Sequence, residues 1–584
     1  MVSEVVSKSD VLVIGGSIAG IFAAIKAREE GASVTLVDKA YTGRSGAAVF
    51  ASAFSVFNSD WGHNLSQWQH EISEIGEYMN NPEWTEIGLR ESYARYEELV
   101  SWGVTFREGT ERLPLRMPGT PRTGRVLESI DFGGGWSILP LMRKQALTKS
   151  VTIVDRVMIT GLLKDEGQVI GAVGFHTGNG DFYVFHAKAT IMCTGAGNLG
   201  ASTHLERPLT YDGEAIAYRA GAFISGSEFS GHLYPVLDSE IEGHIPLGDR
   251  EIRVAPEEVR HAPMGCSIDT DGKKVSLITL SSMVTSIAAG RGPILCDLDA
   301  EVPEEVKAVM AMHQNPDSAL VFDEKFDPTH GGLLYGTART EVYTGLSLHG
   351  GGTGIWSANT DGATSLAGRY AAGDCYNSGA VGAVYPGSGF GTRNAAVTGA
   401  RAGTAAATYA KTTKLLINRT ETDREKSAAY APLERTGGFD AEWVTQQIVS
   451  LMVPFYIFLV KQGDRLRAGA TLLEYLNKQI GPMMYCRPKD AHGLRLVHEA
   501  RGRALMAEVM LRSAEFRTES RGNHYREDYP QRDDPGWLAW VKVRDSDGNM
   551  EVTKQAFPKK WWPDLSVPYE KRYPWRFLNE HISQ

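Results

Sequence analysis

A glycine-rich turn near the start of the chain constrains the fold more than any other feature. Residues 11–14 form an apolar run, as expected for a parallel strand that is buried on both faces. Gly15, Gly16 and Gly20 come next, and the residues that follow have high helix propensity. Gly15 permits a sharp turn, and Gly20 permits the helix to pack closely on the strand. The pattern predicts a strand, a tight turn and a helix whose N-terminus is open to a phosphate group.

The segment after this helix completes a dinucleotide-binding unit. Residues 34–37 form a second apolar run, and Asp38 stands where an acid binds the adenosine ribose in such units. Ser17 occupies the usual position of the second glycine and leaves less room for a pyrophosphate. The residues predicted to bind the dinucleotide here are Gly15, Gly16, Ser17, Ile18, Ala19, Gly20, Asp38 and Lys39.

A second glycine-rich segment lies far along the chain, at residues 368–374. It combines a short apolar strand with Gly373 and Asp374. In flavoproteins with two such segments, the second one returns to the same sheet and holds the ribityl and phosphate region of the flavin. The two segments together indicate FAD rather than NAD. The alternative is a structural glycine turn in an ordinary βαβ unit.

Composition and charge argue against several classes of function. The chain has 584 residues, so two to four domains are expected. Its formal net charge is −10 without a long basic run, which argues against nucleic-acid binding. No apolar stretch reaches about 18 residues, so no membrane span is expected, and no signal peptide is recognised. The five scattered cysteines cannot ligate an iron–sulfur cluster by themselves, so no metal site is predicted; a reduced, cytoplasmic setting fits such thiols.

The order of the patterns predicts an α/β fold, in which a Rossmann-like FAD-binding domain carries an inserted α+β capping domain and is followed by a C-terminal helical domain. Residues 151–195 alternate like an antiparallel insertion that crosses the main sheet, and the polar residues 418–427 have the composition of a linker. The tail from Trp561 is aromatic and must pack either on this chain or on a partner. The predicted boundaries are 1–234 and 346–415 for the FAD-binding domain, 235–345 for the capping domain, and 428–584 for the helical domain and tail.

Several blocks in a fixed order extend these patterns over nearly the whole chain: residues 42–48, 194–197, 211–222, 368–374 and 519–530. Together they resemble the flavoprotein subunits of the succinate dehydrogenase and fumarate reductase superfamily, which also includes aspartate oxidase and the alpha subunit of adenylylsulfate reductase. Residues 387–394 are predicted to open a helix over residues 395–403. In that family this helix directs its N-terminus at the flavin pyrimidine, where the helix dipole stabilises negative charge on the reduced flavin. The resemblance implies further FAD contacts at Arg44, Ser45, Gly46, Ala47, Thr194, Gly195, Asp212, Gly373, Asp374, Ser388, Gly389 and Phe390.

Departures from the family pattern change what is expected of the site. Gly46 stands where succinate dehydrogenases carry the histidine that bonds to the flavin, so non-covalent FAD is expected. Met283 stands where fumarate reductases carry their proton-donating arginine, so succinate and fumarate are not expected as substrates. The Ser45-Gly46-Ala47 pattern and residues 349–356 resemble the adenylylsulfate reductase branch more closely.

The candidate catalytic groups are histidines and arginines near the predicted flavin. A histidine can bind a substrate anion or move a proton near neutral pH, and an arginine on the cap can replace the missing proton donor. For each of them a purely structural role is the alternative. The candidates are His232, His349, Arg291, Arg339 and Arg393.

A further basic cluster near the end of the chain comprises Arg521, His524 and Arg526 and is framed by acids. It is either a salt-bridge network between domains or a part of the site near the flavin edge.

The leading interpretation is an FAD-dependent oxidoreductase that serves as the flavoprotein component of a multi-subunit enzyme. A small anionic substrate would exchange a hydride or an electron pair with flavin N5. The electrons would pass to or from a separate carrier, and a ferredoxin-like iron–sulfur subunit fits that role. The alternatives are sulfur-nucleotide chemistry of the adenylylsulfate reductase kind, and a flavin-binding redox sensor or assembly protein without turnover.

Overall fold

The computed structural model describes most of the chain, but only short strands between residues 230 and 352. The described residues are 3–51, 53–106, 113–114, 127–199, 209–229, 232–235, 244–247, 250–253, 267–268, 294–297, 333–336, 340–343, 353–387, 389–452, 457, 460–573, 577 and 579–580. The predicted capping domain therefore lies largely outside the described residues. The same holds for the candidates His349, Arg291, Arg339 and Ser388, and for Met283.

The main sheet has seven strands in the order β6-β2-β1-β9-β8-β7, with β19 also paired to β9. Strand β1 lies between β2 and β9 and is parallel to both. Its last four residues are buried, which explains the continuous apolar run in the sequence. The strands are β1 (Glu4–Ile14), β2 (Val34–Val37), β6 (Thr152–Val154), β7 (Val157–Asp165), β8 (Gln168–His176), β9 (Phe182–Met192) and β19 (Arg369–Ala371).

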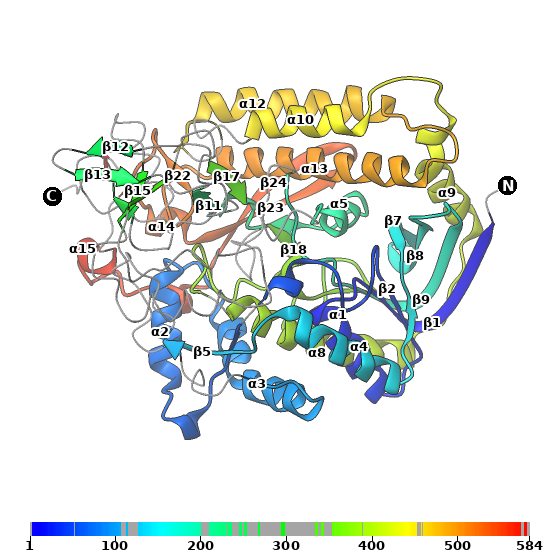
Figure 1. Cartoon of the computed structure of the whole chain (residues 1–584), viewed down its shortest axis with the longest axis horizontal. Coiled ribbons are helices and arrows are strands. Elements are labelled where there is room, and N and C mark those ends of the chain that lie inside the picture. Colours follow the sequence, from blue (N-terminus) through cyan, green and yellow to red (C-terminus); the bar gives the residue numbers. More distant parts are fainter. Residues whose placement is uncertain are drawn as a thin grey trace.

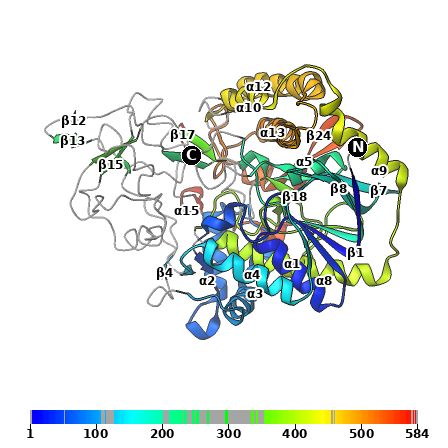
Figure 2. The ribbon, with the colours of Figure 1, turned by 45° about the vertical axis from the view of Figure 1, so that its right-hand side comes forward.

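Helices α1 (Ile18–Glu29) and α8 (Phe390–Thr412) lie side by side against this sheet, next to α4 (Gly135–Thr148) (Figures 1 and 2). Gly399 and Gly403 of α8 face the backbone of α1 so closely that a Cβ at either position would overlap it. These two glycines therefore allow close packing between helices that lie more than half the chain apart.

Residues 151–195 differ in part from the prediction. Strands β7, β8 and β9 are antiparallel neighbours, as expected. Strand β6 instead pairs in parallel with β2 at the edge of the main sheet. It follows helix α4 directly, and a strand that returns to a sheet through a helix usually does so in parallel. Side-chain alternation alone does not distinguish the two orientations.

A second sheet of five strands has the order β20-β18-β10-β23-β24. Its hairpin β23–β24 falls within the segment predicted to be helical, so that segment is not helical throughout. The helix α5 (Asp212–Arg219) precedes β10 in the chain. The strands are β10 (Ile224–Ser225), β18 (Gly354–Trp356), β20 (Tyr376–Asn377), β23 (Ala539–Ser546) and β24 (Asn549–Ala556).

The helices of the C-terminal part gather on one side of the molecule, where α10 and α12 cover α13 (Figure 1). The predicted linker at 418–427 is wrong, because these residues lie in α9, whose N-cap Asn418 accepts a hydrogen bond from the N–H of Glu421. Their polarity belongs to a largely exposed helix. The helices are α9 (Arg419–Glu434), α10 (Ala441–Met452), α12 (Gly463–Tyr475) and α13 (Ala491–Phe516).

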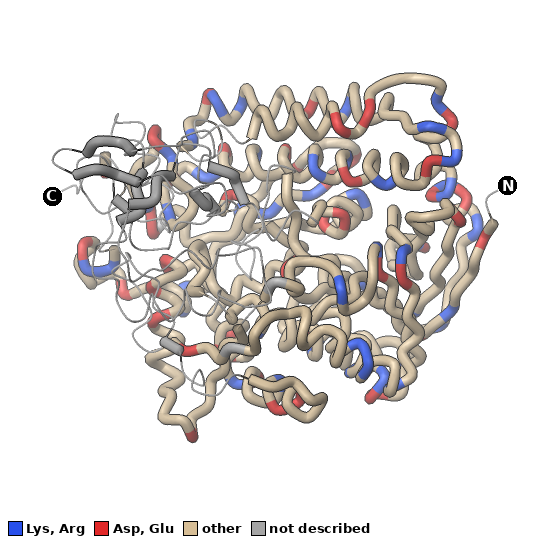
Figure 3. Tube along the Cα trace, viewed as in Figure 1, with Lys and Arg blue, Asp and Glu red and all other residues tan. Residues whose placement is uncertain are grey.

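Shorter elements complete the description. Among the described residues, no helix combines the length and apolarity needed to cross a membrane. Acidic and basic residues are interspersed along the helices in the view of Figure 3. The remaining elements are η1 (Ala47–Phe50), β3 (Ala53–Ser55), η2 (Ser59–Trp61), α2 (Leu65–Ile75), α3 (Pro82–Ser101), β4 (Leu113–Pro114), β5 (Glu128–Asp131), η3 (Ser227–Phe229), β11 (His232–Pro235), β12 (His244–Leu247), β13 (Arg250–Arg253), β14 (Ser267–Ile268), β15 (Ile294–Asp297), β16 (Leu333–Gly336), β17 (Thr340–Tyr343), η6 (Gly373–Cys375), β21 (Val460–Lys461), η7 (Leu476–Ile480), η8 (Gly481–Met483), β22 (Tyr525–Arg526), α14 (Asp534–Trp537), η9 (Lys559–Trp561) and α15 (Tyr569–Arg572).

Candidate cofactor and active site

The carboxyl ends of three parallel strands meet at one edge of the main sheet. The last residues of β1 and β19 are both paired with Met192, the last residue of β9. The loops that follow carry Gly15, Thr194 and Asp374, so the strand register brings the two glycine-rich segments together. Ligands of open α/β sheets bind outside the carboxyl ends of the strands. The predicted cofactor residues therefore occupy the expected edge.

Backbone geometry explains the glycines of the first turn. Gly15 has a φ of +105°, and a Cβ there would overlap the backbone of Cys193. A Cβ at Gly20 would overlap the carbonyl oxygen of Gly15, so α1 reaches its position only with glycine there. Ser17 is the N-cap residue of α1, but its hydroxyl makes no capping hydrogen bond. The first N–H groups of the helix therefore have no side-chain cap and suit an anion.

Asp38 ends the second strand of the unit and is buried against the turn. Its carboxylate accepts hydrogen bonds from the N–H groups of Gly16 at 2.8 Å and Ala40 at 2.7 Å, and from the Ser45 hydroxyl at 3.1 Å. These contacts hold the acid beside the N-terminus of α1, where the sequence predicts the ribose contact. Ribose binding by Asp38 stays a prediction.

Lys39 and Asp212, both predicted to bind the cofactor, bind each other. The Lys39 ammonium donates to Asp212 at 2.7 Å, to Glu499 of α13 at 2.9 Å and to the Thr210 hydroxyl at 2.7 Å. Burial lowers the pKa of Lys39, but the two carboxylates outweigh burial and raise it above its usual value. Lys39 therefore ties β2 to α5 and α13. The second carboxylate oxygen of Asp212 has no partner among the described residues.

The edge of the sheet offers polar groups and open space that fit a dinucleotide. Gly15, Ser17 and Gly195 are partly exposed, whereas the strands behind them are buried. The Thr194 hydroxyl is buried, and besides its contact with the Cys375 thiol it has no hydrogen-bond partner among the described residues, which in a native structure points to a ligand or solvent contact. Gly46 has a φ of +79° with no atom close to a Cβ built on it. These residues fit FAD as the resemblance implies.

The N-terminus of α8 carries a buried cation. Gly389 caps the helix in the left-handed conformation with a φ of +91°, without a side-chain hydrogen bond. Arg393 is fully buried, and its guanidinium lies 4.1 Å from the centroid of the Phe390 ring. None of its three side-chain nitrogen atoms has a hydrogen-bond partner among the described residues. Burial lowers the pKa of Arg393 to about 9. The side chain packs toward Gly88 of α3.

Sequence reasoning overlooked two buried acids near these elements. Glu214 lies in the first turn of α5, and neither of its carboxylate oxygens has a partner among the described residues. Glu228 accepts a hydrogen bond from Arg517 at 3.0 Å, but its other oxygen has no such partner. Burial raises the pKa of both acids. The available signal was an acid within an apolar, buried segment of the chain.

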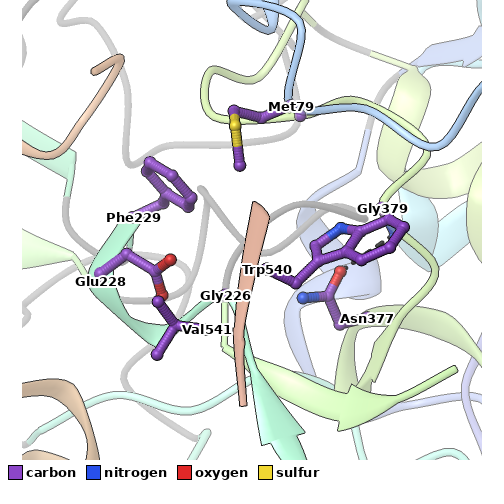
Figure 4. Close-up of a pocket in the computed structure, with 9 residues that line it drawn as sticks. Met79, Gly226, Glu228, Phe229, Asn377, Gly379, Trp540 and Val541 are labelled. Carbon is purple, nitrogen blue, oxygen red and sulfur yellow. Dashed lines mark hydrogen bonds between the residues drawn. The ribbon is translucent and has the colours of Figure 1, made fainter. Parts of the chain in front are cut away.

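A small pocket lies between η3 and the loop that follows η6. It therefore adjoins the segment before His232 and the segment after Asp374. Asn377 is fixed at its wall, because the Asn377 amide donates to Ser225 at 2.9 Å. The backbone of His232 pairs with β17, but its side chain is not described. Figure 4 shows the pocket, which is lined by Met79, Gly226, Glu228, Phe229, Asn377, Gly379, Gly382, Trp540 and Val541.

The basic cluster near the end of the chain belongs to a buried salt-bridge network. Arg521 donates to Glu519 at 2.8 Å and to Asp534 at 2.9 Å. Arg532 binds Glu77 at 2.7 Å and also binds Glu580 of the tail. We call this set the C-terminal ion network; its members are Glu77, Glu228, Arg517, Glu519, Arg521, Arg532, Asp534, Tyr573 and Glu580.

The two other members of the predicted cluster are also structural. Arg526 binds Asp528 at 2.7 Å and donates to backbone carbonyls. His524 is fully buried, and burial holds its pKa well below the usual value, so its neutral ring donates from Nε2 to the Arg517 carbonyl. Of the two interpretations of this cluster, the buried ion pairs of Arg521 and Arg526 favour the salt-bridge network.

The aromatic tail packs on its own chain. Tyr573 and Phe577 are buried, and the Phe577 ring stacks on Tyr525 with centroids 5.5 Å apart. Trp561 contacts Trp540 edge to face at 5.7 Å. The sequence left open whether the tail packs on this chain or on a partner. The described part of the tail packs on this chain.

Comparisons with known proteins agree with this architecture. The chain matches the family model for an FAD binding domain over residues 10–232, and the model for a fumarate reductase flavoprotein C-terminus over residues 457–572. It is 25% identical to a fumarate reductase flavoprotein subunit of Mycobacterium tuberculosis, over 95% of this chain and 98% of the relative. It is 26% identical to a subunit of the fumarate reductase (CoM/CoB) of Methanothermobacter marburgensis, over 89% and 94%.

Among solved structures, adenylylsulfate reductase of Archaeoglobus fulgidus superposes with a TM-score of 0.76. The alignment covers 96% of this chain and 97% of the other, at 19% identity. At that identity the likeness is one of fold.

Proposed function

Because the chain belongs to the FAD-dependent oxidoreductases of the succinate dehydrogenase and fumarate reductase superfamily, we propose that it exchanges a hydride or an electron pair between a small anionic substrate and its FAD. The fold class, the cofactor and the enzyme class predicted from the sequence are confirmed by the comparisons. The domain boundaries and the roles of individual residues stay predictions.

The observation that carries the proposal is the unpaired cation at the start of α8. Arg393 is fully buried and has no hydrogen-bond partner among the described residues. A buried charge is costly unless a counter-charge accompanies it. The N-terminus of α8 favours negative charge at the same place through its dipole. Both features support an anion that binds there during the reaction.

The buried charge of Arg393 determines what the chain contributes beside the cofactor. When bound, FAD supplies the acceptor or donor of the hydride. Arg393 and the first turn of α8 stabilise negative charge beside it without rearrangement, since both are held by packing before the substrate arrives. Arg393 has a lowered pKa of about 9, so it still carries its charge at neutral pH.

We also propose that FAD is held without a covalent bond. Gly46 offers no nucleophile, and the space around it is open. Acid precipitation should therefore release the flavin into the supernatant, and flavin retained on the denatured polypeptide would contradict this.

The electrons are proposed to pass to a separate carrier in the cytoplasm, for which a ferredoxin-like iron–sulfur subunit fits. Two of the similar proteins, the fumarate reductase flavoprotein subunit of Mycobacterium tuberculosis and the fumarate reductase (CoM/CoB) subunit of Methanothermobacter marburgensis, are themselves subunits. Cys193, Cys375 and Cys486 are buried and free, which fits a reducing setting. Rapid turnover of the purified chain with oxygen or a nicotinamide, without a copurified partner, would contradict the role of a subunit.

The test is anaerobic titration of the FAD-loaded protein with small anions, including succinate, fumarate with a low-potential donor, and adenylylsulfate. A true substrate should bleach the flavin or restore its colour. Arg393→Met should weaken that response at least about tenfold and Arg393→Lys less, because the lysine keeps the charge. Equal responses of the Arg393→Met variant and the wild type would refute the role of Arg393. Bleaching by none of the anions would refute the anionic substrate.

A further inference from the structure

Glu214 is a buried acid that lies at the carboxyl edge of the main sheet. It belongs to the first turn of α5, and its side chain is completely buried. The start of α5 is in close contact with the end of β9, because a Cβ on Gly213 would overlap the Thr194 side chain. Glu214 is therefore fixed beside the loop that carries two predicted FAD contacts, Thr194 and Gly195.

Neither carboxylate oxygen of Glu214 has a hydrogen-bond partner on any other described residue. Buried acids in native structures are normally paired with a cation or satisfied by hydrogen bonds. Glu228 in the same molecule has Arg517 as its cation. Lys39 donates to Asp212 of the same helix, and its ammonium is also bound by Glu499 and Thr210.

The charges that face Glu214 oppose its ionisation. Asp212 on its own helix and Asp374 on η6 both add to the effect of burial and raise its pKa. Cys375 on η6 is close enough for Glu214 to raise the pKa of its thiol as well. On β19, buried Arg369 donates from Nε to Thr364, and its Nη2 has no partner among the described residues. On α13, Glu499 is bound to Lys39. Glu214 thus sits among acids and holds its proton.

A protonated carboxyl group donates one hydrogen bond, and this one is held at an edge where oxygen acceptors are expected. When FAD binds at this edge as expected, its phosphate and ribityl oxygens would lie near the residues around Gly15, Thr194 and Asp374. We propose that Glu214 binds FAD as a neutral acid, by donating its carboxyl proton to an oxygen of the pyrophosphate–ribityl region. The inference depends on FAD binding and not on the identity of the substrate.

A neutral acid makes FAD affinity depend on pH with a definite sign. Loss of the proton removes the donor and places a negative charge beside an anionic cofactor. The dissociation constant for FAD should therefore rise with pH once the pH exceeds the pKa of Glu214 in the apoprotein, by up to about tenfold per pH unit. A glutamine at this position keeps a donor and cannot ionise, so it should abolish that dependence.

The experiment measures FAD binding to the apoprotein by fluorescence titration, from about pH 6 to about pH 9.5. Wild type should lose affinity as pH rises. Glu214→Gln should bind within about threefold of wild type at low pH and show a flat profile. Glu214→Leu, which has no donor, should bind at least about tenfold more weakly at low pH. Glu508→Gln is the matched control, because it changes another buried acid, which Asn477 and Arg512 bind, and it should retain the wild-type pH profile.

A Glu214→Gln variant with the same pH profile as wild type would overturn the proposal, and so would a Glu214→Leu variant with unchanged affinity. If Glu214→Leu does not fold, the comparison of wild type with Glu214→Gln decides alone. The outcome is independent of the proposed reaction. If no anion bleaches the flavin and the binding profiles still behave as expected, the reaction is wrong and the role of Glu214 stands.

Discussion

Two regions of this molecule bury ionisable side chains. In one region these side chains are paired, and in the other they have no partner among the described residues. In the C-terminal ion network, Arg521 binds Glu519 and Asp534, and Arg532 binds Glu77 and a tail carboxylate. At the carboxyl edge of the main sheet and the start of α8, Glu214 and Arg393 are buried just as deeply but have no partner among the described residues.

The difference separates structural charge from functional charge. A buried pair that satisfies its own hydrogen bonds fixes the geometry of the elements that carry it, and losing one partner is costly. A buried charge or acid without a partner destabilises the free protein, because it has lost its contacts with water. A ligand that pairs with it can remove this destabilisation. Substitutions in the two regions should therefore differ in size and in sign, and the largest effect is expected in the C-terminal ion network.

Arg521→Met should be the most damaging substitution. It would leave Glu519 and Asp534 buried with fewer counter-charges, so the free energy of unfolding should fall by about 3–5 kcal/mol. Urea unfolding of the FAD-loaded protein measures this. Arg467→Ala, which removes an exposed arginine, is the control and should leave stability nearly unchanged. A loss at Arg521 no larger than at Arg467 would remove the basis of the comparison.

Asp38→Ala should weaken FAD binding by about 1–3 kcal/mol, because the ribose hydroxyls would lose their acceptor. The N–H of Gly16 would also lose the acceptor that it has in this structure. Fluorescence titration of the apoprotein gives the affinity, and Asp155→Ala, which removes the partner of Arg143, controls for local unfolding. Equal affinities of wild type and Asp38→Ala would exclude the ribose contact.

Arg393→Met should have the opposite sign from Arg521→Met in the apoprotein. Removing an unpaired buried cation should leave stability unchanged or raise it by about 1–2 kcal/mol, because methionine has no charge to desolvate. The flavin response to anions should nevertheless fall in the same variant. Thermal and urea unfolding of the apoprotein decide the matter, and destabilisation as large as that of Arg521→Met would mean that Arg393 is structural.

Lys461 should make the free energy of unfolding depend on pH. Burial lowers its pKa to about 7, with the charge of Arg526 adding to the effect. The unfolded chain therefore binds more protons than the folded one above about pH 7, and this group makes stability rise with pH, by up to about 1.4 kcal/mol per pH unit, until the unfolded pKa is reached. Lys461→Met should flatten the rise between about pH 7 and pH 9. An unchanged slope of stability against pH in the Lys461→Met variant would contradict this prediction.

Local patterns in the sequence were enough to predict the turn of the first unit. Gly15 and Gly20 act through contacts with residues close by in space along one strand and one helix, so their spacing carries the information. Lys39 and Asp212 were predicted as separate cofactor contacts, although Lys39 donates to both Asp212 and Glu499. That arrangement depends on a helix near the other end of the chain, which no local pattern reveals.

The same limit explains the errors elsewhere. Arg521, His524 and Arg526 could be recognised as a basic cluster framed by acids, but Arg521 also donates to the Glu77 carbonyl and the Tyr573 hydroxyl, which are distant in sequence. Glu214 was passed over because helix periodicity describes which side of a helix is buried, not whether a buried acid finds a partner. The polar residues 418–427 looked like a linker because composition does not separate an exposed helix from a loop.

The close packing of α8 on α1 has a consequence for synthesis. Strand β1 and helix α1 are complete by residue 29, yet the helix that covers them begins at Phe390. At about 5–20 residues per second, the ribosome takes from roughly 20 s to more than a minute to make the intervening chain. During that interval the apolar side of α1 that later contacts Gly399 and Gly403 has no cover from α8, and both glycine-rich segments cannot yet meet at FAD. The growing chain is therefore most vulnerable to aggregation before α8 emerges, and cofactor capture belongs to the last third of its synthesis.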